Sequence, residues 1–193
     1  MLYQQFSDIF TAQEQSAIDQ EILGNDFPWF YQAETTRIFP QGDLVGTPDP
    51  WSYHYLSHTL VHRSGTGMGQ NLVGTVNSKH WMFFQSIFLR TLDTQGIKID
   101  KILRASLNCS FDNSMSWGRP HVDHNFPHQN FIAYLNHFNE GSTYLFESLD
   151  PNSQQVAVIP GQQGSAAVFS GVPHSQGFCR AGERRVVLVV TFN

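Results

Sequence analysis

The spacing of apolar residues changes along the chain from a helical to a strand-like period. Between residues 7 and 23 apolar side chains recur at nearly helical intervals, and Thr11 stands three positions before Glu14. Thr followed three positions later by Glu is the capping-box pattern of a helix start, so a helix is expected from near Thr11. An apolar stripe over residues 77–93 predicts a second helix, which ends before a glycine.

From residue 97 onward short apolar runs alternate with turn residues, which is typical of strands. The predicted strands are 98–110, 120–124, 130–137, 143–147, 155–159, 165–170, 174–178 and 184–192. An earlier strand is expected at 53–62, between loops at 33–52 and 63–70. Helices followed by many short strands favour an α+β, mainly β fold, in which a two-sheet antiparallel roll carries the helices on one face. We expect one domain over residues 1–193.

Composition and charge favour a globular protein with a packed core and exclude several other classes. Of the 193 residues 40% are hydrophobic and 16 are Phe, which is enough for a packed core without disulfides. Cys109 and Cys179 are too few for a disulfide framework and are expected to be buried free thiols. The net charge of -5 argues against non-specific nucleic-acid binding. Neither a secretory leader nor a membrane span is apparent, so a soluble, cytoplasmic protein is expected.

A group of candidate metal ligands lies in the C-terminal half. His121 and Asp123 are two residues apart, and on a strand such residues point to the same face, with His124 on the other face. His174 follows far downstream. Two histidines and one carboxylate are the ligand set of a mononuclear non-haem Fe(II) site. A structural zinc site would need four ligands, usually cysteines. A surface histidine–aspartate pair without metal is the alternative reading.

The motifs around these residues resemble a known family. After "HVD" the chain carries "NFIAYLN", then "PGQQGSAAVFSGVPHSQ", then "RRVVLVVTFN". In this order, over residues 100–193, they resemble the Fe(II)- and 2-oxoglutarate-dependent oxygenases, in particular the prolyl-4-hydroxylase-like branch. The resemblance implies a double-stranded β-helix, or jelly roll, with residues 1–96 as helical and strand support and 97–193 as the metal-binding β core. It also implies that His121, Asp123 and His174 are the iron ligands.

The resemblance further implies an arginine that pairs with the far carboxylate of 2-oxoglutarate. Arg184 and Arg185 lie on opposite faces of the last predicted strand, and the family pattern favours Arg184, with Arg185 as the alternative. The hydroxyl of Tyr134 is expected on the same carboxylate, and Asn108 is a candidate for the pocket wall. Arg104 is a further inward-facing candidate outside this set.

The expected activity is that of a dioxygenase that hydroxylates a C–H bond, with succinate and CO2 as co-products. Its partners would be Fe(II), 2-oxoglutarate, O2 and a peptide residue or small molecule. The alternative is a cupin-like metal-dependent protein that is not an oxygenase, or a non-catalytic binding module, on the same roll. Those proteins do not need a cation after the last ligand. Neither the oligomeric state nor the substrate can be inferred from the sequence.

Overall fold

Two antiparallel sheets make up most of the structure, a computed structural model that describes residues 2–33, 51–65 and 69–193. The large sheet has the strand order β1-β9-β6-β11-β5-β3-β2, with β4 paired to β3, and the small sheet has the order β10-β7-β8. The strands are β1 (Tyr3–Phe6), β2 (Phe30–Gln32), β3 (Tyr55–His62), β4 (Thr75–Val76), β5 (Ile102–Phe111), β6 (Gln129–Tyr134), β7 (Thr143–Phe146), β8 (Gln155–Ile159), β9 (Ala166–Ser170), β10 (His174–Gln176) and β11 (Arg184–Phe192).

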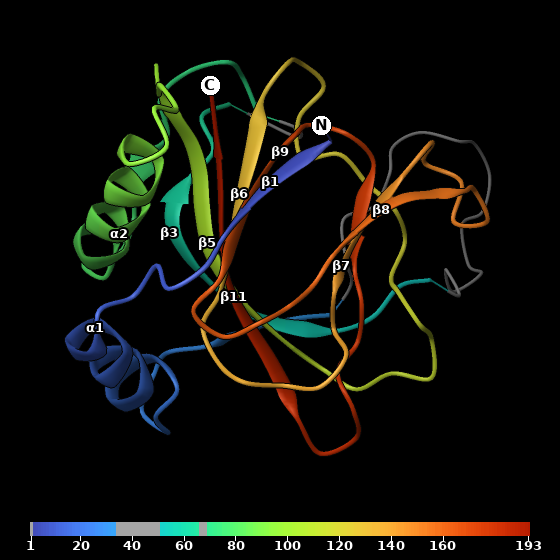
Figure 1. Cartoon of the computed structure of the whole chain (residues 1–193), viewed down its shortest axis with the longest axis horizontal. Coiled ribbons are helices and arrows are strands. Elements are labelled where there is room, and N and C mark those ends of the chain that lie inside the picture. The colour runs from blue at the N-terminus through green and yellow to red at the C-terminus, as the bar shows by residue number, and fades with distance from the viewer. Residues whose placement is uncertain (1, 34–50, 66–68) are drawn as a thin grey trace.

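The helices cover one face of the large sheet (Figure 1). Helix α1 (Ala12–Ala17) begins at the predicted capping box and continues into a π-helical turn, η1 (Ile18–Ile22). Helix α2 (Trp81–Asp93) lies beside β3 and β5. The ring of Phe88 on α2 lies 5.1 Å from that of Phe131 and 5.3 Å from that of Phe192. Burial of each Phe side chain contributes about 1.5–3 kcal/mol to the free energy of folding, so the packing of α2 stabilises the sheet.

Strand alternation gives the large sheet two different faces. On β11 the side chains that pack against the helices are Val186, Leu188, Val190 and Phe192. The intervening side chains face the small sheet, and they are Arg185, Val187, Val189 and Thr191. The space between the sheets is therefore lined by alternate residues of the central strands, and it contains the candidate site.

The predicted two-sheet roll with helices on one face is confirmed, as are the two buried free thiols. The strand predicted at 120–124 is wrong, because within it only His121 forms a bridge, to the first residue of β10. The next bridge is Trp117 to Gly177, so the pairing on that side is interrupted and no continuous strand forms. The loops expected at 33–52 and 63–70 lie partly outside the described residues.

Strand β1 was not expected from the sequence. Its residues Tyr3–Phe6 pair with β9 at the edge of the large sheet, although two of the four side chains are exposed glutamines. Such a strand is fixed by its neighbour rather than by a hydrophobic pattern of its own. Among the helices that the structure describes, none is long and apolar enough to cross a membrane.

Candidate metal centre

Two segments far apart in the sequence are joined at the centre of the site. The backbone N–H of His121 donates to the carbonyl oxygen of His174, and the N–H of His174 donates to that of His121, both at 2.9 Å. This reciprocal pair fixes the two side chains relative to each other, and their ring centroids are 4.6 Å apart. The ligand segments are therefore positioned by main-chain hydrogen bonds as well as by side-chain packing.

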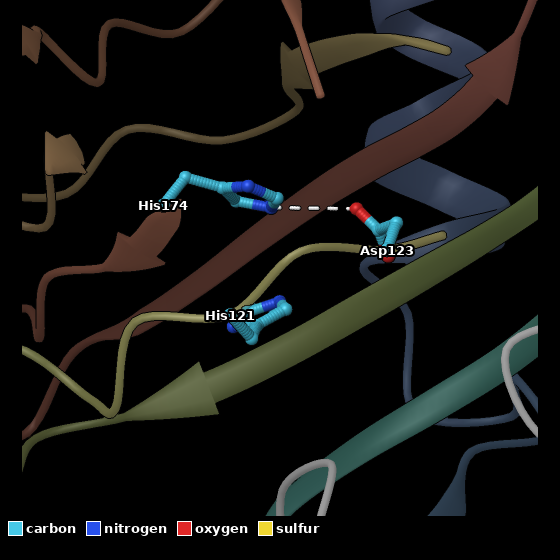
Figure 2. A group of neighbouring side chains, drawn as sticks. All are labelled: His121, Asp123 and His174. Carbon is cyan, nitrogen blue, oxygen red and sulfur yellow. Dashed lines mark ion pairs between the residues drawn. The ribbon is translucent and has the colours of Figure 1, made fainter. Parts of the chain in front are cut away.

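Asp123 completes a cluster of three potential metal ligands (Figure 2). His121, Asp123 and His174 each offer one ligand atom, and these atoms all lie within 4.8 Å of one another. Nε2 of His174 is 3.3 Å from Oδ2 of Asp123. Asp123 and His174 are buried and His121 is partly buried, so the three side chains converge in a space largely shielded from water.

The outer nitrogens of both rings face main-chain carbonyl groups. Nδ1 of His174 lies 2.9 Å from the carbonyl oxygen of Val172, and Nδ1 of His121 lies 3.3 Å from that of Arg119. A carbonyl oxygen only accepts, so each Nδ1 carries a proton when it makes this bond. Nε2 of each ring then has the free lone pair, which is the usual way a metal-binding histidine is oriented.

The charge states also match those of metal ligands. Burial, together with the nearby His174 ring, lowers the pKa of His121 to about 4. Burial alone would raise the pKa of Asp123, but the neighbouring His174 and Arg104 hold it well below the usual range. At neutral pH the site thus presents a neutral imidazole at His121 and an ionised carboxylate, the forms that bind a divalent cation.

Two arginines hold the other carboxylate oxygen. Arg104 donates from Nη1 to Oδ1 of Asp123 at 2.9 Å, and Arg63 donates from Nη2 to the same atom at 3.3 Å. Oδ2 has no hydrogen-bond partner among the described residues and faces His174. Burial and the neighbouring Arg104 lower the pKa of Arg63 to about 10, which still leaves it charged at neutral pH. One oxygen of Asp123 is therefore anchored, and the other is available to a metal ion.

Arg185 lies in the same pocket as the three ligands. Its side chain is 1% exposed, and it donates from Nε to the carbonyl of Gly141 at 2.7 Å and from Nη2 to Oγ1 of Thr143 at 3.0 Å. The guanidinium carbon lies 5.5 Å from the ring centre of Tyr134, whose hydroxyl is 2.9 Å from the same Thr143 oxygen. No carboxylate among the described residues forms an ion pair with this buried cation.

The structure separates the two arginines that the sequence left as alternatives. Arg184, the favoured residue, points to the helix face, where its Nη2 donates to the carbonyl of Leu23. Arg185 points into the pocket. The expected alternation of the strand is confirmed. Arg185, the alternative residue, is the one on the pocket side, because a shift of one residue along a strand reverses the face on which a side chain lies.

Of the two remaining predicted site residues, Asn108 lines this pocket, and Tyr134 is fully buried against Arg185 and Thr143. Tyr134 lies beside Arg185, and Asn108 lies across β11 from Tyr134, since both are in register with Val187. Oδ1 of Asn108 is buried without a hydrogen-bond partner in the described part of the chain. The structure thus brings together His121, Asp123, His174, Arg185 and Asn108 in one pocket, with Tyr134 beside Arg185, and leaves Arg184 out.

Sequence reasoning missed several polar residues of the pocket. Asn130 and Gln176 line it, and Arg63 contacts Asp123 from the end of β3. Alternation along β6 would have placed Asn130 on the inner face, because it shares that face with Tyr134. The sequence holds no comparable signal for Arg63.

The sequence matches no protein-family model and no curated protein. The fold, in contrast, is similar to solved structures of oxygenases. A 2OG-Fe(II) oxygenase family oxidoreductase from Burkholderia pseudomallei superposes with a TM-score of 0.68 at 17% identity, over 100% of this chain and 85% of that one. A prolyl hydroxylase from Trichoplax adhaerens, in complex with a hypoxia inducible factor peptide fragment, gives 0.62 at 11% identity, over 99% and 83%.

A prolyl-4-hydroxylase from Pseudomonas putida is similar at a TM-score of 0.52 and 12% identity, over 100% of this chain and 92% of that one. At such low identities the similarity establishes the architecture only. It agrees with the resemblance found in the motifs of the C-terminal half. The protein has the jelly-roll fold seen in 2-oxoglutarate- and Fe(II)-dependent oxygenases, including prolyl hydroxylases.

Proposed function

We propose that the protein is an Fe(II)- and 2-oxoglutarate-dependent dioxygenase that hydroxylates a C–H bond of a small molecule or a peptide residue. The observation that carries this proposal is the buried cation of Arg185, which shares a pocket with His121, Asp123 and His174 but pairs with no carboxylate of the described residues. The oxygenase fold and the ligand set support the same reading.

A buried guanidinium without an anion is costly, since desolvation of a charge is offset only by pairing and hydrogen bonds. Within the described ranges, the hydrogen bonds of the Arg185 side chain go to neutral groups, on Gly141, Thr143 and Gln176. A carboxylate would complete this environment, because the planar fork of arginine binds it through two parallel charge-assisted bonds. A dicarboxylate that also reaches the ligand cluster fits both ends of the pocket.

The three ligands would occupy one side of the metal ion and leave the opposite positions to the co-substrate and O2. Fe(II) with 2-oxoglutarate supplies oxidation of a C–H bond by O2, with release of succinate and CO2. The chain itself holds the co-substrate: Arg185 binds its far carboxylate, and Tyr134 lies beside that carboxylate. Burial raises the pKa of Tyr134, so its hydroxyl keeps the proton that it donates.

The pocket also limits access of water to the reacting atoms. Its apolar lining comes from the inner face of the large sheet, and includes Ile132, Val187, Val189 and Phe169. The ring of Phe169 lies 5.1 Å from that of His174, so it shields one side of that ligand. A dry pocket strengthens the interaction between Arg185 and a carboxylate, because the local dielectric constant is low.

The test is a titration without oxygen, followed by a product assay in air. Protein loaded with Fe(II) should develop a metal-to-ligand charge-transfer absorption band when 2-oxoglutarate is added, and should release succinate once air is admitted. A matched ligand is 2-oxopentanoate, which has the same chain but lacks the far carboxylate, and it should bind much more weakly. Absence of both the band and succinate would refute an oxygenase and favour a metal-binding module on the same roll.

A further inference from the structure

Two arginines from different strands converge on a single carboxylate oxygen. Arg104 on β5 and Arg63, the residue after β3, both donate to Oδ1 of Asp123, at 2.9 and 3.3 Å. The side chains of Arg63 and Arg104 are 22% and 24% exposed, whereas that of Asp123 is 4% exposed. The contact of Arg104 alone would anchor the carboxylate. The positive charge of Arg63 is therefore only weakly neutralised by Asp123.

The charges in the pocket remain unbalanced even after metal and co-substrate are bound. Fe(II) and Arg185 together carry three positive charges, and 2-oxoglutarate and Asp123 together carry three negative charges. Among the described residues that line the pocket, Asp123 is the only acidic one. The positive charges of Arg63 and Arg104 are then left over, at the partly exposed side of the ligand cluster.

Both guanidinium groups also have unused hydrogen-bond donors. An arginine carries five N–H donors. In the structure Arg104 uses two nitrogens, Nη1 toward Asp123 and Nη2 toward Oγ of Ser106 at 3.3 Å. Toward the described residues, Arg63 donates from Nη2, and its Nε is buried and has no partner among them. Buried donors are rarely left unpaired, so a ligand with acceptor oxygens fits this position.

The unpaired amide of Asn130 is a second observation that indicates a ligand near Arg104. Thr191 on β11 is in register with Arg104 on one side and with Asn130 on the other, so the three side chains form a polar row across the sheet. The hydroxyl of Thr191 is already 2.8 Å from Nε2 of His124. Asn130 is 1% exposed and lines the pocket, yet neither its amide oxygen nor its nitrogen has a hydrogen-bond partner among the described residues.

This polar row is distinct from the position proposed for 2-oxoglutarate. Arg185 is in register with Ser110, six residues along β5 from Arg104. At about 3.3 Å per residue, the backbone positions of Arg104 and of Ser110, the partner of Arg185, are roughly 20 Å apart along β5. The carboxylate that Arg185 binds therefore lies at the other end of the pocket, and the free donors of Arg63 and Arg104 are open to a second anion.

We propose that Arg63, Arg104 and Asn130 form a subsite for a carboxylate group of the prime substrate, the molecule that is oxidised. This inference rests on the proposed oxygenase function, because it assigns the substrate class of the same pocket. The guanidinium groups bind the carboxylate oxygens, and the amide nitrogen of Asn130 donates a further hydrogen bond. The carboxylate belongs either to a free organic or amino acid or to an acidic peptide residue.

The experiment compares acids with their amides on protein that cannot turn over. Protein loaded with Mn(II) and saturated with 2-oxoglutarate is titrated by calorimetry at low salt. The probes are benzoate and benzamide, and a peptide capped at both ends that contains Glu or Gln. Inorganic phosphate is a further probe. We expect at least one acid to bind about tenfold or more tightly than its amide, a difference of about 1.4 kcal/mol. Tighter binding of the small acid indicates a free acid as the substrate, and tighter binding of the Glu peptide indicates an acidic peptide residue.

Variants test the assignment to these residues. Arg63→Gln leaves the Arg104–Asp123 contact in place and should weaken the acid about tenfold, while Asn130→Ala should weaken it less. Arg180→Gln is the matched control, because Arg180 pairs with exposed Glu140 and does not line the pocket, and it should have no effect. Circular dichroism and retained Mn(II) verify that each variant folds.

Equal binding of acid and amide, no binding of any acid, binding of phosphate alone, or equal loss in Arg63→Gln and Arg180→Gln would each overturn the subsite. The outcome is separable from that of the proposed function. Failure of the oxygenase shows up as a missing charge-transfer band and missing succinate, whereas failure of the subsite shows up in the acid–amide comparison alone.

Discussion

Replacement of Arg185 by Gln is the most direct test of the co-substrate site. The variant removes the buried cation but keeps a polar side chain that can still hydrogen-bond to Gly141 or Thr143, which now accept from Arg185. Arg184→Gln is a matched control on the same strand, one residue away and on the opposite face. It removes the hydrogen bond to the carbonyl of Leu23 and leaves the pocket intact.

The expected loss follows from the contacts available to a carboxylate. Nε of Arg185 is used by Gly141, so Nη1 and Nη2 are the atoms that offer donors to the ligand. A hydrogen bond between charged groups contributes about 1.5–3 kcal/mol. Two such bonds at the lower end give about 3–4 kcal/mol, which weakens 2-oxoglutarate by two to three orders of magnitude at about 1.4 kcal/mol per tenfold.

The assay is an anaerobic titration of Fe(II)-loaded protein with 2-oxoglutarate, read from the charge-transfer band, together with thermal unfolding of each variant. Arg185→Gln should raise the midpoint of the 2-oxoglutarate titration by two to three orders of magnitude. Its affinity for 2-oxopentanoate, which lacks the far carboxylate, should change little. Arg184→Gln should keep the affinity for 2-oxoglutarate but lose about 1 kcal/mol of stability, because its partner carbonyl lies on the helix side.

A larger loss of 2-oxoglutarate affinity in Arg184→Gln than in Arg185→Gln would refute the placement of the two side chains. An equal loss of affinity for 2-oxoglutarate and 2-oxopentanoate in Arg185→Gln would show that Arg185 does not bind the far carboxylate. Either result would remove the observation on which the proposed function depends.

Three further predictions concern single residues. His174→Ala should lower Fe(II) affinity by at least about tenfold, measured by metal analysis after dialysis, while the exposed His137→Ala should retain the metal. Tyr134→Phe should weaken 2-oxoglutarate by about 1 kcal/mol in the same titration, since it loses one neutral hydroxyl, and an unchanged midpoint would remove that hydroxyl from the site. The hydrogen bond from Arg90 lowers the pKa of Glu14 below its usual 4.5, so this pair stabilises the fold above that pH and its contribution is lost as the pH falls through the lowered pKa. Glu14→Gln should therefore cost roughly 0.5–1 kcal/mol in denaturant unfolding at pH 7 and much less at pH 3. An equal cost at both pH values would contradict the ion pair.

Patterns with a strong local cause were predicted correctly from the sequence. The capping box at Thr11 and Glu14 starts helix α1 as expected, because both partners lie within four residues of each other. Alternation on the last strand separated Arg184 from Arg185 correctly. In each case the deciding interactions are local, so the sequence contains them directly.

Features that depend on a distant partner could not be predicted in the same way. The edge strand Tyr3–Phe6 exists because β9 lies beside it, and the segment around Asp123 is held by one bridge instead of a strand. Which face of β11 meets the small sheet depends on how the whole roll closes, so the choice between Arg184 and Arg185 had no local signal. Arg63 reaches Asp123 from β3 for the same reason.

The reciprocal hydrogen bonds between His121 and His174 have a consequence for how a metal ion is taken up. The cost in conformational entropy of bringing these two segments together is met when the chain folds, so binding of an ion does not have to supply it. The two amides should therefore exchange with solvent deuterium only slowly, and at similar rates in the metal-free and metal-loaded protein. Such a site fills without a folding step, and its occupancy follows the supply of metal.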